Sequence, residues 1–114
     1  MERRGDPRVR NLIEMMVQFL GGTLDEVPQR YEEASPIKRA DKDTPPALLL
    51  HGDQDQSVLP VQSEMMHKRL VELGVPSELE IYDGGKGHGW HEVSPDFWVT
   101  LERMTAFIKK YFNI

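Results

Sequence analysis

Apolar residues recur at helical spacing in two long stretches of the chain. From residue 9 to residue 20 they fall at i, i+3, i+4, i+7, i+8 and i+11, which is one face of an α-helix. These residues are Val9, Leu12, Ile13, Met16, Val17 and Leu20. Near the carboxyl end, the same kind of stripe is formed by Phe97, Leu101, Met104, Ile108 and Tyr111. The pattern therefore predicts an amphipathic helix at each end of the chain.

Residues that start and stop helices stand at the ends of these stretches. Asp6-Pro7 and Ser94-Pro95 each offer a capping side chain followed by a proline suited to the first turn. Further along, Thr23-Leu24-Asp25-Glu26 has the spacing of a capping box. We therefore expect a short helix at Pro28–Ala34, which must stop before Pro36.

Two strands and a crossover helix are predicted in the second half. Ala47–His51 is a continuous apolar run, typical of a strand covered by helices on both faces, and Glu78–Tyr82 alternates polar and apolar residues. Between them, a helix is expected to begin at Pro60 and to end at Gly74. Strands separated by a crossover helix run parallel. The fold class is therefore α/β, with parallel strands, flanking helices and an incomplete sheet.

Composition excludes several classes of protein. The 114 residues include no cysteine, which excludes a disulfide scaffold, a thiolate zinc site and a cysteine nucleophile. The 14 basic and 19 acidic residues give a net charge of −5, which argues against a nucleic-acid or anionic membrane surface. No apolar run approaches the roughly 20 residues that a membrane helix requires. We also expect no signal peptide, which favours the cytoplasm for the chain as given.

Two polar loops follow the predicted strands, and they carry the candidate chemistry. The first loop begins at Gly52 and contains Asp53 and Asp55, and the second runs from Asp83 to His91. The carboxyl ends of neighbouring parallel strands lie at one edge of a sheet, about 4.8 Å apart. A carboxylate that accepts a hydrogen bond from one imidazole nitrogen leaves the other nitrogen free as a general base. Asp55 and His88 fit these roles.

Other residues in these loops compete for the same roles. Asp53 lies in the same turn as Asp55, and His91 offers a second imidazole close to His88. We favour Asp55 because it fits the acid position, and His88 because its flanking glycines leave the backbone adaptable. His51 ends a buried strand, where a histidine bonded to the backbone is the commoner arrangement.

The same loops contain two residue patterns that partly resemble metal sites. The acidic spacing after His51 partly matches a calcium-binding loop, but Val58 stands where the sharp turn requires glycine. His88 and His91 on a glycine-rich loop are a weak zinc signal. We therefore predict no metal and no cofactor.

The first loop with its strand, Thr44-Pro45-Pro46-Ala47-Leu48-Leu49-Leu50-His51-Gly52-Asp53-Gln54-Asp55-Gln56-Ser57-Val58, resembles the acid-bearing H-G-x-x-D segment of the α/β-hydrolase superfamily. Gly87-His88-Gly89-Trp90 resembles its histidine loop, and the region from Gly21 to Pro36 is similar to bacterial carboxylesterases of the acetyl-xylan and feruloyl esterase type. Peptidases of the prolyl-oligopeptidase type share both motifs. The resemblance implies a C-terminal portion of an α/β-hydrolase in which Asp55 is the catalytic acid and His88 the base.

The chain departs from that superfamily in its nucleophile. The superfamily places a serine on a G-x-S-x-G elbow upstream of the acid, and none of the five serines here has those glycines. They are Ser35, Ser57, Ser63, Ser77 and Ser94. We therefore expect residues 1–114 to be one partial domain, inactive alone, from an enzyme that acts on a small-molecule ester.

Assembly follows from the incomplete sheet. The strand Ala47–His51 has a predicted neighbour on one side only, and an open strand edge recruits a pairing partner. We expect a homo-oligomer that uses this edge or exchanges elements between copies. A non-catalytic, self-associating module is the alternative to a hydrolase portion.

Overall fold

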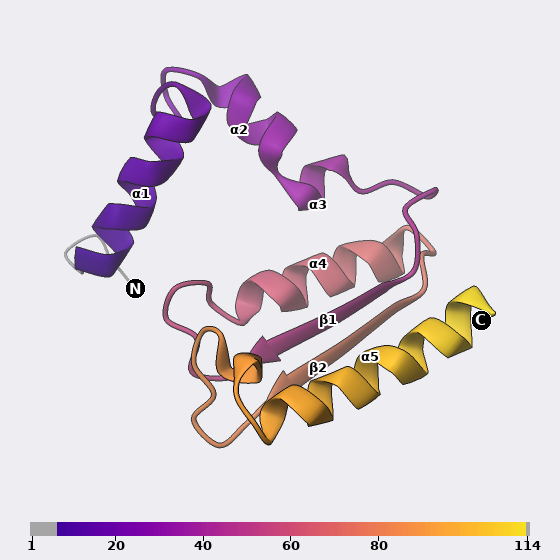
Figure 1. Cartoon of the computed structure of the whole chain (residues 1–114). Coiled ribbons are helices and arrows are strands. Elements are labelled where there is room, and N and C mark those ends of the chain that lie inside the picture. The colour runs from indigo at the N-terminus through magenta and orange to yellow at the C-terminus, as the bar shows by residue number, and fades with distance from the viewer. Residues whose placement is uncertain (1–6, 114) are drawn as a thin grey trace. The chain divides into compact units, whose positions relative to one another are not determined.

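The computed structural model describes residues 7–113, so the predicted Asp6 cap lies outside the described residues. The chain divides into two compact units, one up to Ala40 and one from Asp41 onward (Figure 1). The first unit is helical throughout its regular structure, with α1 (Pro7–Leu20), α2 (Pro28–Ala34) and α3 (Pro36–Arg39). No helix among residues 7–113 has the length and apolar character that a membrane crossing requires.

Two hydrogen-bonded turns join the helices α1 and α2 of the first unit. α1 ends at Gly21, whose φ of 85° is left-handed and whose amide donates to the Val17 carbonyl at 2.9 Å. Thr23 and Glu26 exchange the two reciprocal bonds of a capping box, at 3.0 Å and 3.3 Å. Hydrogen bonds from the Thr23 amide and the Thr23 hydroxyl to the Glu26 carboxylate lower the pKa of Glu26. The predicted box thus exists, although it closes the turn before α2 rather than the helix itself.

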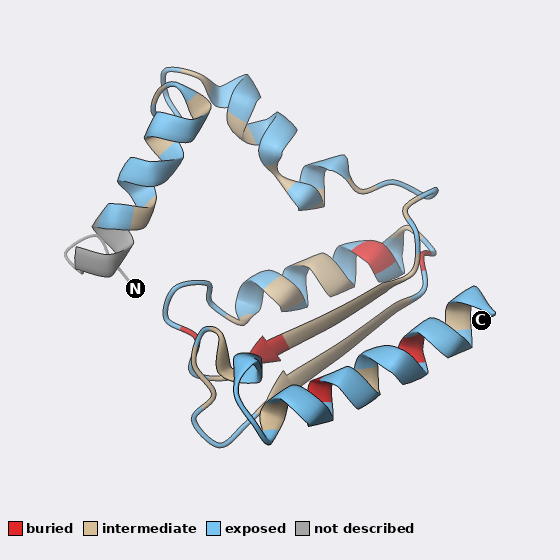
Figure 2. Ribbon diagram, in the orientation of Figure 1, coloured by how far each residue is buried: buried red, intermediate tan, exposed pale blue. Residues whose placement is uncertain are grey.

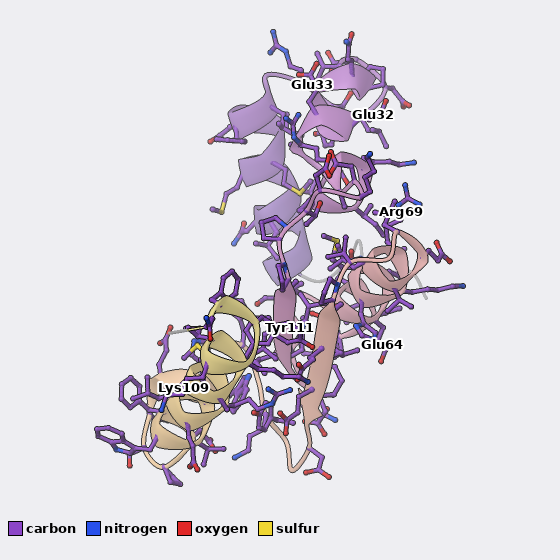
Figure 3. All side chains as sticks on the ribbon, turned by 90° about the vertical axis from the view of Figure 1, so that its right-hand side faces the viewer. Glu32, Glu33, Glu64, Arg69, Lys109 and Tyr111 are labelled. Carbon is purple, nitrogen blue, oxygen red and sulfur yellow. The ribbon has the colours of Figure 1, made fainter. Side chains whose placement is uncertain are left out.

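The predicted helix Pro28–Ala34 is confirmed with its bounds, and one helix was missed. Ser35 is extended, with φ −83° and ψ 117°, as a residue before proline prefers to be. Pro36 therefore ends α2 and also suits the first turn of the four-residue α3. Glu32 and Glu33 on α2 are exposed (Figure 3).

The second unit contains a two-stranded parallel sheet, as predicted. β1 (Ala47–Gly52) and β2 (Ser77–Tyr82) pair in register, from Ala47 opposite Ser77 to Gly52 opposite Tyr82. α4 (Val61–Glu72) connects them. α4 and α5 (Asp96–Phe112) lie on opposite sides of the strands (Figures 1 and 3). This is a helix–sheet–helix arrangement with the carboxyl ends of both strands at one edge.

The end of α4 explains how the chain enters β2. Gly74 has a left-handed φ of 77°, its amide donates to Val71, and the Val75 amide donates to the Leu70 carbonyl at 2.9 Å. These are the two hydrogen bonds of a Schellman motif. Leu70 and Val75, which flank it, are 0% and 4% exposed, so the apolar contact that accompanies the motif is part of the core.

The start of α5 differs from the prediction. Ser94 makes no cap, and α5 begins at Asp96. Pro95 occupies the cap position with φ −86° and ψ −8°, after a cis Ser94–Pro95 bond. The Ser94 side chain therefore stands one residue too early to reach the first free amides of the helix.

Burial in the second unit is concentrated at a few positions (Figure 2). Of β1, only His51 and Gly52 are buried, although its apolar run predicted cover on both faces. On α5, Thr100 and Phe107 are buried, while most of the predicted stripe is about 40% exposed. Its exposed members are Phe97, Leu101, Met104 and Ile108. The reason is that two strands are too narrow to cover the apolar face of a 17-residue helix.

Charged side chains fasten α5 to β2. Arg103 donates to Glu80 at 2.8 Å and to Glu78 at 2.7 Å, and Lys110 reaches Glu78 at 3.0 Å. Hydrogen bonds from Tyr111, Lys110 and Arg103 lower the pKa of Glu78 to about 2. Figure 3 shows Tyr111 and Lys109 on this helix.

Candidate active site

The carboxylate of Asp55 is held by its own loop. Its Oδ1 accepts hydrogen bonds from the amides of Ser57 and Val58, both at 2.9 Å. The Asp55 amide donates to the Gly52 carbonyl at 3.3 Å. Asp55 is 5% exposed, so these bonds replace water that the carboxylate would otherwise bind. The loop after β1 thus builds a buried, oriented carboxylate from local contacts.

The pKa of Asp55 reports the balance of two opposing effects. Burial raises it, but the hydrogen bonds from the Val58 amide, His88 and the Ser57 amide, together with the attraction of His88, outweigh burial. The net result is a pKa below the ordinary value of 3.8. Asp55 is therefore an anion throughout the neutral range.

His88 meets this carboxylate from the second loop. Its Nδ1 lies 3.0 Å from Asp55 Oδ2, and its side chain is 64% exposed. The juxtaposition follows from the register, because Gly52 pairs with Tyr82 and both loops leave the same edge of the sheet. The structure thus brings together the two residues that the sequence predicted as acid and base.

Asp53, the alternative acid, makes a different contact. Its Oδ1 accepts a hydrogen bond from the Lys86 amide at 2.9 Å, and the Gln54 amide donates to the Lys86 carbonyl at 2.9 Å. The peptide groups of Lys86 are therefore bound from both sides by the first loop. The Lys86 ammonium also pairs with Asp96, at the start of α5, at 2.9 Å. Asp53 holds the histidine loop and does not touch an imidazole among the described residues.

Gly52 permits this close approach. A Cβ at Gly52 would lie 2.3 Å from the Lys86 carbonyl oxygen and 2.8 Å from Trp90 Cδ1, so no larger residue fits. Sequence reasoning missed Lys86 as an anchor. The glycine between His51 and Asp53 was the available signal, since glycine in such a place marks a backbone approach.

The rest of the histidine loop divides into a free tip and a packed end. At the tip, Gly84 and Gly85 have left-handed φ values of 86° and 83°, and nothing lies within 4 Å of their Cβ positions. At the packed end, Trp90 stacks on Tyr82 with ring centroids 4.3 Å apart. His91 lies edge-on to Trp90 at 5.8 Å and makes no contact with Asp55 in the described structure. The second imidazole is therefore outside the pair.

A depression of about 270 Å³ surrounds the pair, and its lining includes Val58, His88, Trp90 and Glu92. Because Asp55 accepts from Nδ1–H of His88, the lone pair of this imidazole is on Nε2, for which residues 7–113 supply no hydrogen-bond partner. Such a nitrogen can take a proton from a hydroxyl group brought to it.

None of the serine hydroxyls in the described part of the chain contacts His88. Ser63 and Ser77 bond instead to His51 and His67, at 2.6 Å and 2.7 Å. Over the same residues, no three carboxylate or imidazole side chains gather as a metal site would need. The residues that the structure describes can therefore orient a base and accept a proton at this site, and they place no serine hydroxyl on that base.

Comparisons with known proteins find relatives that are named as a peptidase and an esterase. The chain is 34% identical over 73 residues to "Uncharacterized peptidase YtmA" of Bacillus subtilis, covering 64% of this chain and 28% of that protein. It is 37% identical over 71 residues to "Esterase LipC" of Mycobacterium tuberculosis, covering 60% of this chain and 17% of that protein. The chain thus spans about a quarter or less of these relatives.

A solved structure of an esterase is also similar to this chain. The "Truncated form of carbohydrate esterase from gut microbiota" superposes with a TM-score of 0.60 and 29% identity, over 71% of this chain and 28% of that one. The fold is accordingly a partial α/β-hydrolase fold, as the sequence predicted. Residues 11–114 match the prolyl oligopeptidase family, Peptidase_S9. The chain therefore belongs to the prolyl oligopeptidase family.

Proposed function

We propose that this chain is the acid- and base-bearing portion of a serine hydrolase that cleaves esters of small molecules. The observation that carries the proposal is the 3.0 Å contact between His88 Nδ1 and a buried, ionised Asp55. An esterase and a carbohydrate esterase among the similar proteins support ester chemistry.

In this proposal, His88 is the general base. Its free Nε2 accepts the proton of a serine supplied by a G-x-S-x-G elbow, and the serine oxygen attacks the ester carbonyl. Asp55 keeps the proton of the imidazole on Nδ1 and stabilises the imidazolium that forms. His88 then gives this proton to the leaving alcohol as the ester C–O bond breaks, which leaves an acyl-serine. Water, deprotonated by His88, attacks the acyl-serine, and the serine oxygen leaves with that proton, so that the carboxylic acid is freed.

The 114 residues alone are proposed to be inactive. They contain no elbow serine, and the amides of an oxyanion hole are worth about 3–4 kcal/mol each to the transition state. A substitute serine would have to reach His88 Nε2, and the Ser63 and Ser77 hydroxyls are already bonded elsewhere. We expect the chain to hydrolyse p-nitrophenyl acetate no faster than free imidazole does.

The test is complementation with a fragment that carries the elbow from a family member. Turnover of p-nitrophenyl acetate and serine labelling by a fluorophosphonate should appear only in the mixture. His88→Ala and Asp55→Asn should then each lower kcat by about 10⁴-fold, because the tautomer and the base are lost. His67→Ala, outside the site, is the control. A loss with His91→Ala but not with His88→Ala would assign the base to the other imidazole.

A second function is favoured by the family itself. A peptidase is one of the similar proteins, and the pair of Asp55 and His88 serves an amide bond as well as an ester. The same complemented enzyme, assayed with a p-nitroanilide beside the matching p-nitrophenyl ester, separates the two. A higher kcat/KM for the anilide would replace the esterase proposal with a peptidase.

We also propose that the chain self-associates, whether or not it takes part in catalysis. β1 pairs with β2 on one side only, and a cavity of about 420 Å³ opens beside Leu48 and Leu50 on the α5 side. An unpaired strand edge next to apolar surface favours pairing with a second copy. Light scattering should show an oligomer whose melting temperature rises with concentration. A stable monomer at micromolar concentration would contradict this.

A further inference from the structure

His51 is a buried histidine that the proposed mechanism leaves unused. It is 8% exposed at the end of β1, and both ring nitrogens are bonded. Nδ1 lies 2.6 Å from the Ser63 hydroxyl, in the first turn of α4, and Nε2 lies 2.7 Å from the Val58 carbonyl oxygen. One imidazole therefore ties together the end of a strand, the acid loop and the start of a helix.

The partners of His51 assign its tautomer. A carbonyl oxygen can only accept, so the ring must donate from Nε2–H to Val58. In the neutral ring Nδ1 then carries the lone pair and accepts from the Ser63 hydroxyl. The other neutral tautomer would set the lone pair of Nε2 against the Val58 carbonyl oxygen at 2.7 Å. The neutral ring therefore has one arrangement of donors and acceptors here.

The backbone of Val58 links this histidine to Asp55 through two successive peptide groups. Its carbonyl accepts from His51, and its amide donates to Asp55 Oδ1 at 2.9 Å. The His51 Nε2 atom also lies 3.4 Å from Asp55 Oδ2, the oxygen that receives His88. The donor side of the His51 ring therefore faces both the residue that holds the carboxylate and the carboxylate itself.

We propose that His51 is a positioning residue for Asp55, acting through the Val58 backbone to fix the carboxylate in the orientation that receives His88. The significance of this role for catalysis rests on the proposed function, in which Asp55 orients the base. The placing of the carboxylate itself does not depend on hydrolysis and is measurable in the chain as it exists.

The structural test compares three variants of the 114-residue chain by NMR. A glutamine at 51 can place its amide NH₂ near the Nε2 position and keep the donor to Val58, whereas leucine removes it. In His51→Leu, exchange of the Val58 amide should speed up by about tenfold relative to the amides of β2, the equivalent of one lost hydrogen bond. In His51→Gln it should stay within about threefold of the parent chain.

His67→Leu is the matched control. His67 is also a partly buried histidine bonded to a serine, with its Nδ1 2.7 Å from Ser77, but it does not contact the acid loop. It should leave Val58 exchange unchanged relative to β2. If His51→Leu does not fold, His51→Asn replaces it, because the shorter amide reaches Ser63 and not Val58.

The functional test uses the complemented hydrolase. His51→Leu should lower kcat by about 10- to 100-fold at nearly constant KM, because a misplaced acid affects the chemical step. His51→Gln should restore most of kcat, and His67→Leu should match the parent. Equal losses in His51→Leu and His51→Gln would show a packing role and overturn the inference.

The two proposals fail separately. If Asp55→Asn abolishes turnover while His51→Leu changes neither Val58 exchange nor kcat, the positioning role is wrong and the hydrolase proposal stands. If Asp55→Asn leaves turnover intact while His51→Leu still frees the Val58 amide, the hydrolase mechanism is wrong and His51 still positions the carboxylate.

Discussion

The loops that carry Asp55 and His88 are built in opposite ways. The acid loop, which follows β1, is short and largely exposed, but the Asp55 side chain within it is buried and its carboxylate is bonded to amides two and three residues ahead. The histidine loop is rich in glycine, and its imidazole is 64% exposed and depends on contacts made at Lys86 and Trp90. The acid is therefore placed by local sequence, whereas the base is placed by the neighbouring loop and by α5.

This difference indicates where the site is vulnerable. Changes in the acid loop should affect stability first, because they leave the amides of Ser57 and Val58 without the carboxylate that accepts their hydrogen bonds. Changes in the histidine loop should affect the geometry of the Asp55–His88 pair with smaller effects on folding, except at Lys86, which lies against Gly52 and is bonded to Asp53 and Gln54. Four variants test this division, and each is read as the free energy of unfolding in urea.

Gly52→Ala should have the largest effect because it acts on both loops at once. The added Cβ would meet the Lys86 carbonyl at 2.3 Å, and backbone atoms would have to move. We expect a loss of about 3 kcal/mol and the loss of the Asp55–His88 contact. Gly87→Ala is the matched control, because its Cβ position has nothing within 4 Å and its φ is not left-handed. Equal stabilities of the two variants would contradict the close approach.

Asp55→Ala comes next, and it should separate the acid from its partner. The variant leaves the amides of Ser57 and Val58 without an acceptor, at a cost of about 2 kcal/mol, whereas His88→Ala removes an exposed side chain and should cost under about 0.5 kcal/mol. The pKa of Asp55 is lowered, so its contribution is fully present above 3.8 and is lost as the pH falls through the folded-state pKa. The difference in the free energy of unfolding between Asp55→Ala and His88→Ala should therefore become smaller at low pH. If this difference became larger at low pH, the stabilising effect assigned to ionised Asp55 would have the wrong sign.

Glu78 provides a comparison outside both loops. Its pKa of about 2 in the folded state lies below the ordinary 4.5, so its ion pairs stabilise the fold above pH 4.5, and this contribution is lost between pH 4.5 and 2. Glu78 is partly exposed, and we expect about 1 kcal/mol after screening. Glu78→Gln should flatten this part of the pH profile and leave the environment of His88 unchanged by NMR. A profile that kept its slope would assign the acid sensitivity to other carboxylates.

Lys86→Met should have the smallest effect on stability. It removes the ion pair with Asp96 and keeps the backbone bonds to Asp53 and Gln54, so we expect a loss of about 0.5 kcal/mol that shrinks at high salt. Lys109→Met, at an exposed position on α5, should be neutral. A large loss at Lys86 would show that the ammonium, and not the peptide groups, anchors the loop.

The pairing of Asp55 with His88 was predictable because it depends on topology. A strand, a helix and a second strand bring two loops to one edge, and the residue types then decide the chemistry. The contacts that set the geometry were not predictable. The bond of Asp53 to the Lys86 amide, 33 residues away, depends on the exact path of both loops, and the local sequence indicates only a close backbone approach at Gly52.

The buried faces were also harder to predict than the elements. The helix at the carboxyl end was expected, but its buried side chains are Thr100 and Phe107, which the apolar stripe did not include. Periodicity shows which side of a helix is apolar. It does not show how much sheet is available to cover that side, and over residues 7–113 the sheet has two strands.

The free tip of the histidine loop has a consequence for how such a site can be altered. A Cβ added at Gly84 or Gly85 would meet nothing within 4 Å, and both glycines precede Lys86, the residue at which the loop is anchored. A chain lengthened at the tip is therefore held again before it reaches His88. Inserted residues, a reporter group or a substrate-binding extension can be grafted at this point while the imidazole stays on its carboxylate.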